Sequence, residues 1–514
     1  MPTLLLRNGV VHTGPRPGAA RATALAVRDG RIRFVGSDDA AAAYEGADEV
    51  VDLRGALVAP AFVDAHMHAV LTGYPLTQLD LRGTRSLREV LDLVAAHAEA
   101  SGDDTVILGS GWEETDWPEG RGPTAAELDR AAPGKRVCLD RIECHSSVIS
   151  SELAAAIPGL AGITGYHEDG RVELDARHAV TVTLAMMVGP AQRYEAARAA
   201  MAAMAANGVA AFHENAAPHL SPEYELDVVR EAAADAGLLG TYYWGEAGAL
   251  EAARRLGVTG LAGDLNADGA LGSRTAALSA PYDDQPHNCG HPYLTPEEIA
   301  EHVVLCTREG LQAGFHCIGD AGIAAVTEGF RLAERTLGRE ALRAARHRLE
   351  HVEMASPEAM VMMADLGVSA SMQPLFDEMW GGSVGAYAER LGDRWRGMNA
   401  LGSMARAGVS LAFGSDSPVT VVRPWQAIAA ACAHHEPEER ISQLEAFRAH
   451  TVGGWRAGLD DEAGELVEGA PAHLAVWDCA ELVGETGSEL PALGEEPRLL
   501  RLLVEGRTVA REEN

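Results

Sequence analysis

Eight short apolar segments, each followed by helix-forming sequence, constrain the fold of this chain more than any other feature. Ala-rich stretches such as "SPEAMVMMADLG" separate them, so strands and helices alternate. Eight parallel strands of this kind close into a (β/α)₈ barrel, whose functional residues lie at the C-terminal strand ends. The segments are "VAPAFVDAHMH", "GVAAFHENA", "GLLGTYYWG", "GLAGDLNADGA", "LQAGFHCIGD", "RHRLEHVE", "GVSASMQP" and "GVSLAFGSDSP".

The ends of the chain show a different pattern from its middle. Residues 1–57 and 455–514 consist of short β-like runs separated by Gly-containing turns, which predict a small β-sandwich built from both termini. Residues 58–454 make up the predicted barrel. Within them, residues 70–200 separate the first two strands and contain strand-like pieces of their own. We therefore expect this stretch to form an inserted subdomain that caps the mouth of the barrel.

The charge of the chain narrows the range of its partners. With 75 acidic and 42 basic residues the formal net charge is −33, and such a protein repels phosphate backbones and anionic lipids. We expect a small-molecule substrate, and neither a nucleic acid nor a membrane as partner. Seven cysteines without a CxxC pair, and an N-terminus without a signal-like apolar run, favour a cytoplasmic protein. An acidic, Ala-rich barrel could also form a homodimer.

Polar side chains at the predicted strand ends form a pattern. His66 and His68 end the first strand and share one face, because side chains at i and i+2 of a strand point the same way. His316, His351 and Asp416 end the fifth, sixth and eighth strands. A single histidine at such a position is usually a hydrogen-bonded polar residue. Five such groups at one end of a barrel favour the ligands of a divalent metal such as zinc.

Several longer motifs carry a resemblance to a known family. In order between residues 58 and 478 they are "FVDAHMH", "DGALGSRTAAL", "FHCIGD", "HRLEHVE", "FGSDSPV" and "GELVEGAPAHLAVWD". In these motifs the chain resembles the amidohydrolase superfamily, in particular the branch (amidohydrolase family 3) with N-substituted formamide deformylases and imidase-like metal-dependent hydrolases. The resemblance implies an α/β fold with a distorted TIM barrel and a β-sandwich from both termini. It also implies metal-dependent hydrolysis of a non-peptide C–N bond in an N-formyl, N-acyl or cyclic amide.

The resemblance also assigns roles to individual residues. His66 and His68 match the paired metal ligands of the first strand, and His316 matches the ligand of the fifth. His351 matches the sixth-strand histidine, which binds a metal or the reacting oxygen. Asp416 matches the eighth-strand aspartate, which touches the metal, takes a proton from the attacking water and passes it to the leaving nitrogen. Asp416 and His351 are thus the predicted catalytic residues, and all five are expected to lie at the metal.

One departure from the family bears on the number of metals. Members with two metals carry a carboxylated lysine at the fourth strand, whereas the only lysine here is Lys135, in the turn-like "APGKRVC". A carboxylated-lysine bridge is therefore excluded, and we predict one Zn²⁺ per chain, with Fe or Mn also compatible with these ligands. Asp264 or Glu214 could instead supply a carboxylate bridge.

Four further residues are weaker candidates for substrate binding. Trp112 and His145 end predicted strands of the insertion and resemble pocket-lining positions of this branch, although a core tryptophan and a structural histidine fit them equally well. Arg274 could bind a substrate carboxylate or carbonyl, or pair with Asp268 or Asp320 as part of the scaffold. Gln373 follows the seventh strand and could border the pocket.

Two other functions are compatible with the same residues. A single-metal enzyme of this superfamily could deaminate an aminated heterocycle, and release of ammonia would distinguish it from an amide hydrolase. A non-catalytic metal-binding descendant is the second alternative. The complete set of histidines and aspartate argues against that descendant, because a dead site would be expected to have lost a ligand.

Overall fold

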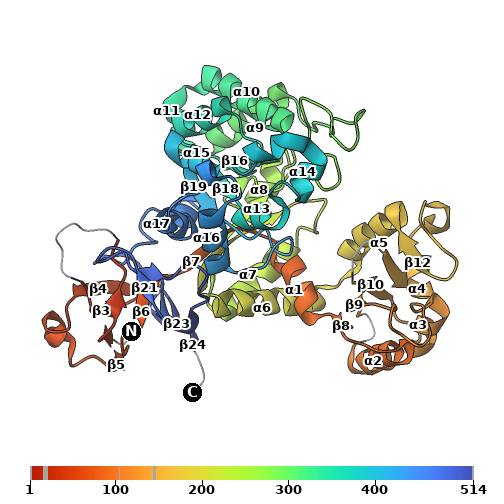
Figure 1. Ribbon diagram of the computed structural model, residues 1–514, viewed down its shortest axis with the longest axis horizontal. Helices are drawn as coiled ribbons and strands as arrows, with labels where there is room; N and C mark the ends of the chain where they lie inside the picture. The colour runs from red at the N-terminus through yellow and green to blue at the C-terminus, as the bar shows by residue number, and fades with distance from the viewer. Residues whose placement is uncertain (1–2, 15–20, 103–104, 143–145, 512–514) are drawn as a thin grey trace. The chain divides into compact units, whose positions relative to one another are not determined.

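An eight-stranded parallel sheet forms the centre of the computed structural model, which describes residues 3–14, 21–102, 105–142 and 146–511 (Figure 1). Each strand corresponds to one of the eight predicted segments. Met67 pairs with Ser417 in a parallel bridge, so the last strand returns to the first and closes the (β/α)₈ barrel. The strands are β7 (Phe62–Met67), β13 (Val209–Ala216), β14 (Leu239–Trp244), β15 (Gly260–Leu261), β16 (Gln312–Cys317), β17 (Arg348–His351), β18 (Ser369–Met372) and β19 (Ser410–Phe413).

Helices connect the barrel strands, and their ends follow local sequence rules. Thr295 and Glu298 form a capping box at the start of α9, and Gly310 ends the same helix in the left-handed conformation. The helices are α6 (Pro190–Ala206), α7 (Glu225–Ala236), α8 (Leu250–Leu256), α9 (Pro296–Glu309), α10 (Asp320–Leu337), α11 (Arg339–Ala345), α12 (Pro357–Leu366), α13 (Pro374–Trp380), α14 (Ala386–Leu391), α15 (Leu401–Ala407), α16 (Pro424–Ala433), α17 (Gln443–Arg448) and α18 (Gly454–Ala457).

The two ends of the chain form the predicted β-sandwich. One sheet has the order β4 (Arg31–Gly36), β3 (Ala24–Arg28), β1 (Leu4–Arg7), β5 (Glu49–Asp52). The other has the order β2 (Val10–Val11), β6 (Leu57–Pro60), β20 (Leu474–Asp478), β23 (Arg498–Val504), β24 (Arg507–Arg511). Strands from opposite ends of the chain thus lie side by side (Figure 1), and one apolar core that includes Leu6, Leu25, Val58, Leu474 and Leu503 joins the sheets.

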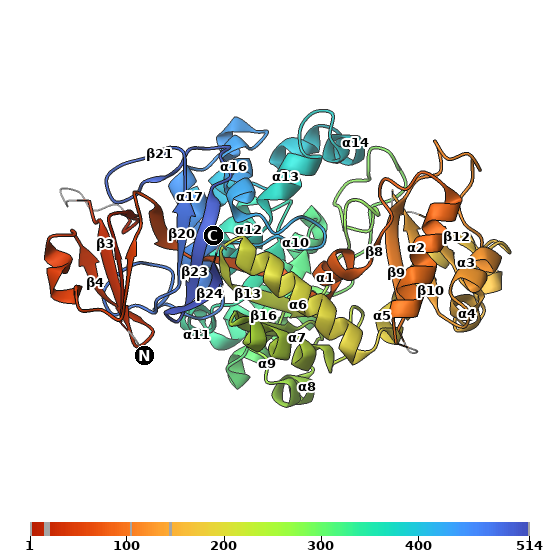
Figure 2. The ribbon, with the colours of Figure 1, turned by 90° about the horizontal axis from the view of Figure 1, so that it is seen from below.

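The inserted region folds as a compact unit of its own. The chain groups into residues 1–68, 201–217 and 233–514 on the one hand, and residues 69–200 and 218–232 on the other. The smaller unit contains a sheet with helices α2 and α3 against it (Figure 2). Its role as a cap stays a prediction. Its elements are α1 (Ala69–Thr77), β8 (Leu79–Asp80), α2 (Leu87–Ala100), β9 (Ile107–Trp112), α3 (Ala125–Ala131), β10 (Val137–Arg141), β11 (Ser146–Ile149), α4 (Ser151–Ala155), β12 (Arg171–Glu173) and α5 (Leu174–Met187).

Most residues of the barrel strands are buried, as is usual for a parallel sheet covered by helices. All six residues of β7 and all eight of β13 are buried. No helix among the described residues combines the length and the hydropathy that crossing a membrane requires. Polar side chains gather at the C-terminal strand ends, and these are the residues that form the site.

Candidate metal centre

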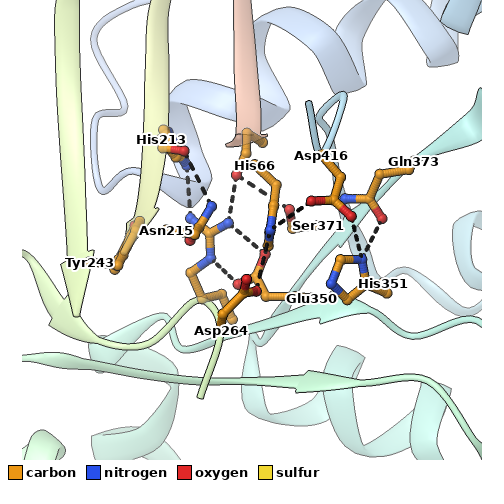
Figure 3. Close-up of polar contacts among 12 residues, drawn as sticks. His66, His213, Asn215, Tyr243, Asp264, Glu350, His351, Ser371, Gln373 and Asp416 are labelled. Atoms are coloured by element: carbon orange, nitrogen blue, oxygen red, sulfur yellow. Dashed lines mark hydrogen bonds and ion pairs between the residues drawn. The ribbon is translucent and has the colours of Figure 1, made fainter. Parts of the chain in front are cut away.

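The first barrel strand brings two buried histidines to one place. The ring centroids of His66 and His68 lie 5.4 Å apart at the end of β7. Nδ1 of His66 lies 2.9 Å from Oε2 of Glu350 and donates a hydrogen bond to that carboxylate. When the ring of His66 is neutral, as metal binding requires, its one N–H lies on Nδ1 and its lone pair on Nε2. This nitrogen faces Asp416 in Figure 3.

Two aspartates from distant strands face both histidines. Asp264, which follows β15, places Oδ1 3.4 Å from Nε2 of His66 and Oδ2 3.3 Å from Nε2 of His68. Asp416, which follows β19, places Oδ1 3.5 Å and 3.4 Å from the same two nitrogens. The amide of Asp416 also donates a hydrogen bond of 2.7 Å to the carbonyl of His66, which ties the end of β19 to the end of β7.

The two histidines and the two aspartates each stabilise the charged form of the other. Burial alone would raise the pKa of Asp264, but His68 and His66 lower it well below its usual range. The histidines lower the pKa of Asp416 in the same way. In return, the carboxylates raise the pKa of His66 and His68 against the effect of burial. Two ionised carboxylates therefore face a pair of imidazole nitrogens in a site largely shielded from water.

His351 and His316 complete the side chains of this region. Nδ1 of His351 lies 2.9 Å from Oε1 of Gln373 and 3.9 Å from Oδ2 of Asp416 (Figure 3). The ring of His351 stacks on Phe376, with the ring centroids 6.1 Å apart. Burial lowers the pKa of His351, so its ring is neutral. The ring of His316 lies 4.5 Å from that of His351, and its Nε2 lies 3.3 Å from the carbonyl oxygen of Gly269.

The residues present fit a divalent ion. Within the described chain, two groups of side chains have ligand atoms close enough to share one: His66 with His68 and Asp416, and His66 with Asp264 and His351. Nε2 of His66 and Oδ1 of Asp264 are buried without a hydrogen-bond partner, which is costly unless another group satisfies them. Ligands about 2.0–2.1 Å from a tetrahedral ion lie about 3.3–3.4 Å apart, the spacing of the nitrogens and carboxylate oxygens here.

The two groups share His66. Nδ1 of His66 is engaged by Glu350, so only Nε2 can bind a metal. One nitrogen lone pair binds one ion. An ion bound at Nε2 of His66 would therefore be common to both groups of side chains. Asp264, which the sequence suggested only as a possible carboxylate bridge, lies within 3.4 Å of Nε2 of both His66 and His68. That His316 is a metal ligand stays a prediction.

Behind His66 lies an ion pair that the sequence analysis missed. Arg348 and Glu350 are fully buried on β17, and their side chains meet through hydrogen bonds of 2.5 Å and 2.8 Å. Arg348 also lies 2.8 Å from Nδ1 of His213 and donates to the carbonyl of Ala65 at 2.7 Å. Opposite charges at i and i+2 in the buried strand "HRLEH" were the signal that could have revealed the pair.

The other predicted site residues are placed as follows. Glu214 is buried on β13, beside Met67 of β7 in the pairing of the two strands. Trp112 is buried in the core of the smaller unit, and its Nε1 donates to the carbonyl of Leu139 at 3.2 Å. His145 lies outside the described residues. Arg274 pairs with Asp284, through Nη2 at 2.6 Å, and neither Asp268 nor Asp320 is its partner in a described contact.

A (β/α)₈ barrel with histidines and aspartates at its C-terminal strand ends is the arrangement expected of a metal-dependent hydrolase. Residues 49–510 match the amidohydrolase family. The chain belongs to this family, which confirms the resemblance, and it is a metal-dependent amidohydrolase that acts on small-molecule substrates.

Relatives of similar length support this assignment. The chain is 26% identical to N-substituted formamide deformylase of Arthrobacter pascens, with 98% of each chain covered. It is also 26% identical to the putative amidohydrolase YtcJ of Bacillus subtilis, over 91% of this chain and 93% of the relative. An uncharacterized metal-dependent hydrolase from Pyrococcus furiosus has a similar structure, with a TM-score of 0.77, 25% identity, and coverage of 92% of this chain and 98% of that chain.

Proposed function

We propose that this chain hydrolyses the C–N bond of an N-formyl, N-acyl or cyclic amide at a single divalent ion. The observation that carries the proposal is the pair of imidazole nitrogens of His66 and His68 facing the carboxylates of Asp264 and Asp416 at 3.3–3.5 Å. Nitrogen and oxygen donors at this spacing suit Zn²⁺ best, with Fe and Mn as further candidates. The name and the full-length match of the formamide deformylase support the substrate class.

The proposed ligands are His66, His68, Asp264 and Asp416, with His351 close by. A divalent ion held there makes water nucleophilic near neutral pH and polarises a carbonyl group. This centre requires no carboxylated lysine, because Asp264 supplies an oxygen donor from the fourth strand. Lys135 instead donates to the carbonyl of Gly102 at 2.6 Å, in the smaller unit.

Asp416 is suited to move the proton. Its Oδ1 faces the two histidines, whereas its Oδ2 points toward His351. One oxygen can therefore stay at the ion while the other accepts a proton from the attacking water and delivers it to the leaving nitrogen. Nδ1 of His351 forms a hydrogen bond with Oε1 of Gln373, which leaves Nε2 of His351 for the ion or the reacting oxygen. Phe376 holds this ring by stacking.

The proposal is tested by metal analysis together with a substrate panel. The purified chain is analysed for metal per chain and assayed on formamides, N-acyl amines, cyclic amides and aminated heterocycles. We expect one ion per chain and release of formate or another carboxylate. In Asp416→Asn, kcat falls by about 10²–10⁴-fold. Asp283→Asn removes an exposed carboxylate that pairs with Arg394, and it should leave the rate unchanged.

Other outcomes would change the proposal. Two ions per chain would contradict the single-ion centre. Ammonia released from a heterocycle, with no hydrolysis of the amides, would favour a deaminase. A protein that binds the ion and hydrolyses nothing would favour the non-catalytic descendant. A cytoplasmic location fits the composition and belongs to the same proposal, whereas the homodimer and the absence of nucleic-acid and membrane partners stay predictions.

A further inference from the structure

The ion pair of Arg348 and Glu350 is unusual because it lies in the interior of the barrel. Neither side chain is exposed to solvent. The two residues flank Leu349 on β17, so both side chains point to the same face of the strand. This face is turned toward β7, where Glu350 meets His66 (Figure 3) and Arg348 meets Ala65.

Stability alone does not account for such a pair. Removing two charges from water costs several kcal/mol per ion, and well-packed apolar residues in their place are often as stable or more stable. The contacts of the pair offer a different explanation. Glu350 accepts the hydrogen bond of His66 Nδ1 at 2.9 Å, and Arg348 holds the carbonyl of Ala65, the residue before His66, at 2.7 Å. Both charges thus act on one histidine.

Arg348 is itself fixed from several strands. Its guanidinium lies over the ring of Tyr243 on β14 at 4.4 Å, and Nη1 lies 2.8 Å from Nδ1 of His213 on β13. Arginine has no acceptor, so His213 accepts this hydrogen bond through a nitrogen lone pair. Burial and the adjacent Arg348 lower the pKa of His213 well below its usual value, which is consistent with a neutral acceptor.

We propose that the Arg348–Glu350 pair positions His66 for metal binding. The carboxylate of Glu350 keeps the proton of His66 on Nδ1 and thereby presents the bare Nε2 to the ion, while Arg348 holds both that carboxylate and the backbone of β7. A carboxylate behind a metal-bound histidine typically strengthens metal binding. This inference rests on the single-ion centre of the proposed function. Arg348 and Glu350 are positioning residues, because they act through His66.

The test compares metal affinity with stability. Glu350→Gln keeps an acceptor oxygen, Glu350→Leu removes it, and Arg348→Met frees the carboxylate. Full-length proteins are stripped of metal, and the Zn²⁺ dissociation constant is measured by competition with a chromophoric chelator. Thermal unfolding of the metal-free proteins is measured in parallel. We expect Glu350→Leu to bind Zn²⁺ about 10- to 100-fold more weakly, with a smaller loss in Glu350→Gln.

The chain offers a matched control in a second buried ion pair. Arg193 and Glu225 pair in the smaller unit, with 1% and 6% of their side chains exposed, and neither has a described contact with the metal centre. Glu225→Gln should lower the unfolding temperature of the metal-free protein and leave the Zn²⁺ dissociation constant unchanged. The visible absorption of the Co²⁺-loaded protein gives a second readout, which should change in Glu350→Gln and not in Glu225→Gln.

The possible results separate this inference from the proposed function. If all Glu350 and Arg348 variants lose stability but keep the wild-type Zn²⁺ affinity within about twofold, the pair is structural and the inference is wrong. If affinity falls as expected and no amide is hydrolysed by the wild-type protein, the inference stands and the proposed function fails. A wild-type protein that binds no Zn²⁺ would overturn both. If Glu350→Leu does not fold, Glu350→Gln and its Co²⁺ spectrum decide.

Discussion

Asp264 follows the fourth barrel strand and faces the predicted metal ligands of the first strand. In two-metal relatives, as the sequence comparison implied, the fourth strand supplies a carboxylated lysine, which bridges two ions. Here the same strand is followed by an aspartate that touches both first-strand histidines. Its carboxylate oxygens lie 3.4 Å from Nε2 of His66 and 3.3 Å from Nε2 of His68. In the proposed centre, these groups share a single ion.

The contribution of Asp264 can be measured with Asp264→Asn. The amide keeps the shape of the side chain but lacks the negative charge, and a neutral oxygen is a weaker donor to Zn²⁺ than a carboxylate. We expect the Zn²⁺ dissociation constant to rise by about tenfold or more, a loss of about 1.4 kcal/mol or more. Asp284→Asn, which breaks the ion pair with Arg274, is the control. Equal Zn²⁺ affinities in wild type and Asp264→Asn would show that Asp264 is not a metal ligand.

A second residue-level prediction concerns the buried His347. Its Nδ1 accepts from the amide of Ala313 at 2.9 Å, and burial lowers its pKa from 6.5 to about 3. Between these values the unfolded chain binds a proton that the folded chain does not. The free energy of unfolding therefore falls as the pH falls through this window, by about 1.4 kcal/mol per pH unit from this group.

Comparison with His347→Gln isolates that contribution. The free energies of unfolding of wild type and variant are measured by urea denaturation between pH 7 and pH 4.5. The advantage of the wild type should shrink steadily below pH 6.5, because the variant lacks the titrating group and all other groups cancel in the difference. His287→Gln, on the surface, serves as the matched substitution. A difference that stays constant across the range would contradict the assignment.

At the scale of elements, the hydrophobic pattern was enough to predict every barrel strand. Most of the strand residues are buried, so most strands read as apolar runs, and the polar residues that end most of them mark the C-terminal end of the barrel. The pairing of Arg348 with Glu350 could not be predicted in this way, because the pattern does not say that a charged pair lies inside the barrel. Nor could it place Asp264, since β15 has only two residues and a long loop follows it.

The closure of the barrel between β7 and β19 gives an element-level prediction. Gly414 directly follows β19, and a Cβ at this residue would lie 2.4 Å from the backbone nitrogen of His66 on β7. A backbone atom of a central strand cannot move aside cheaply, so Gly414→Ala should destabilise the fold by about 1–3 kcal/mol. Because the displaced strand carries His66, the affinity for Zn²⁺ should also fall.

Gly397→Ala provides the control for this substitution. A Cβ at Gly397 would have no atom within 4 Å, so the free energy of unfolding should change by less than about 0.5 kcal/mol. Chemical denaturation of both variants, followed by fluorescence, measures the two effects. Similar stabilities for the two variants would mean that β7 and β19 are held together less tightly than their geometry indicates.

For the whole molecule, the formal net charge of −33 is the dominant physical feature. Many arginines are paired with carboxylates on the surface, as in Arg121 with Glu127 and Arg339 with Glu334. Such exposed pairs contribute about 0–1 kcal/mol each. The acidic residues outnumber the basic ones by 75 to 42, so repulsion among the unpaired carboxylates should outweigh the pairs and oppose the compact state.

Salt should therefore stabilise this protein. Raising the NaCl concentration from about 10 mM to 150 mM shortens the screening length from about 30 Å to about 8 Å, which weakens long-range repulsion more than contacts between paired neighbours. We expect Tm to rise by about 2–4 °C, the shift that corresponds to about 1 kcal/mol in a large domain. KCl at the same ionic strength should have the same effect, and glucose at the same osmolarity should have none. A fall in Tm with added salt would show that the surface ion pairs outweigh the repulsion.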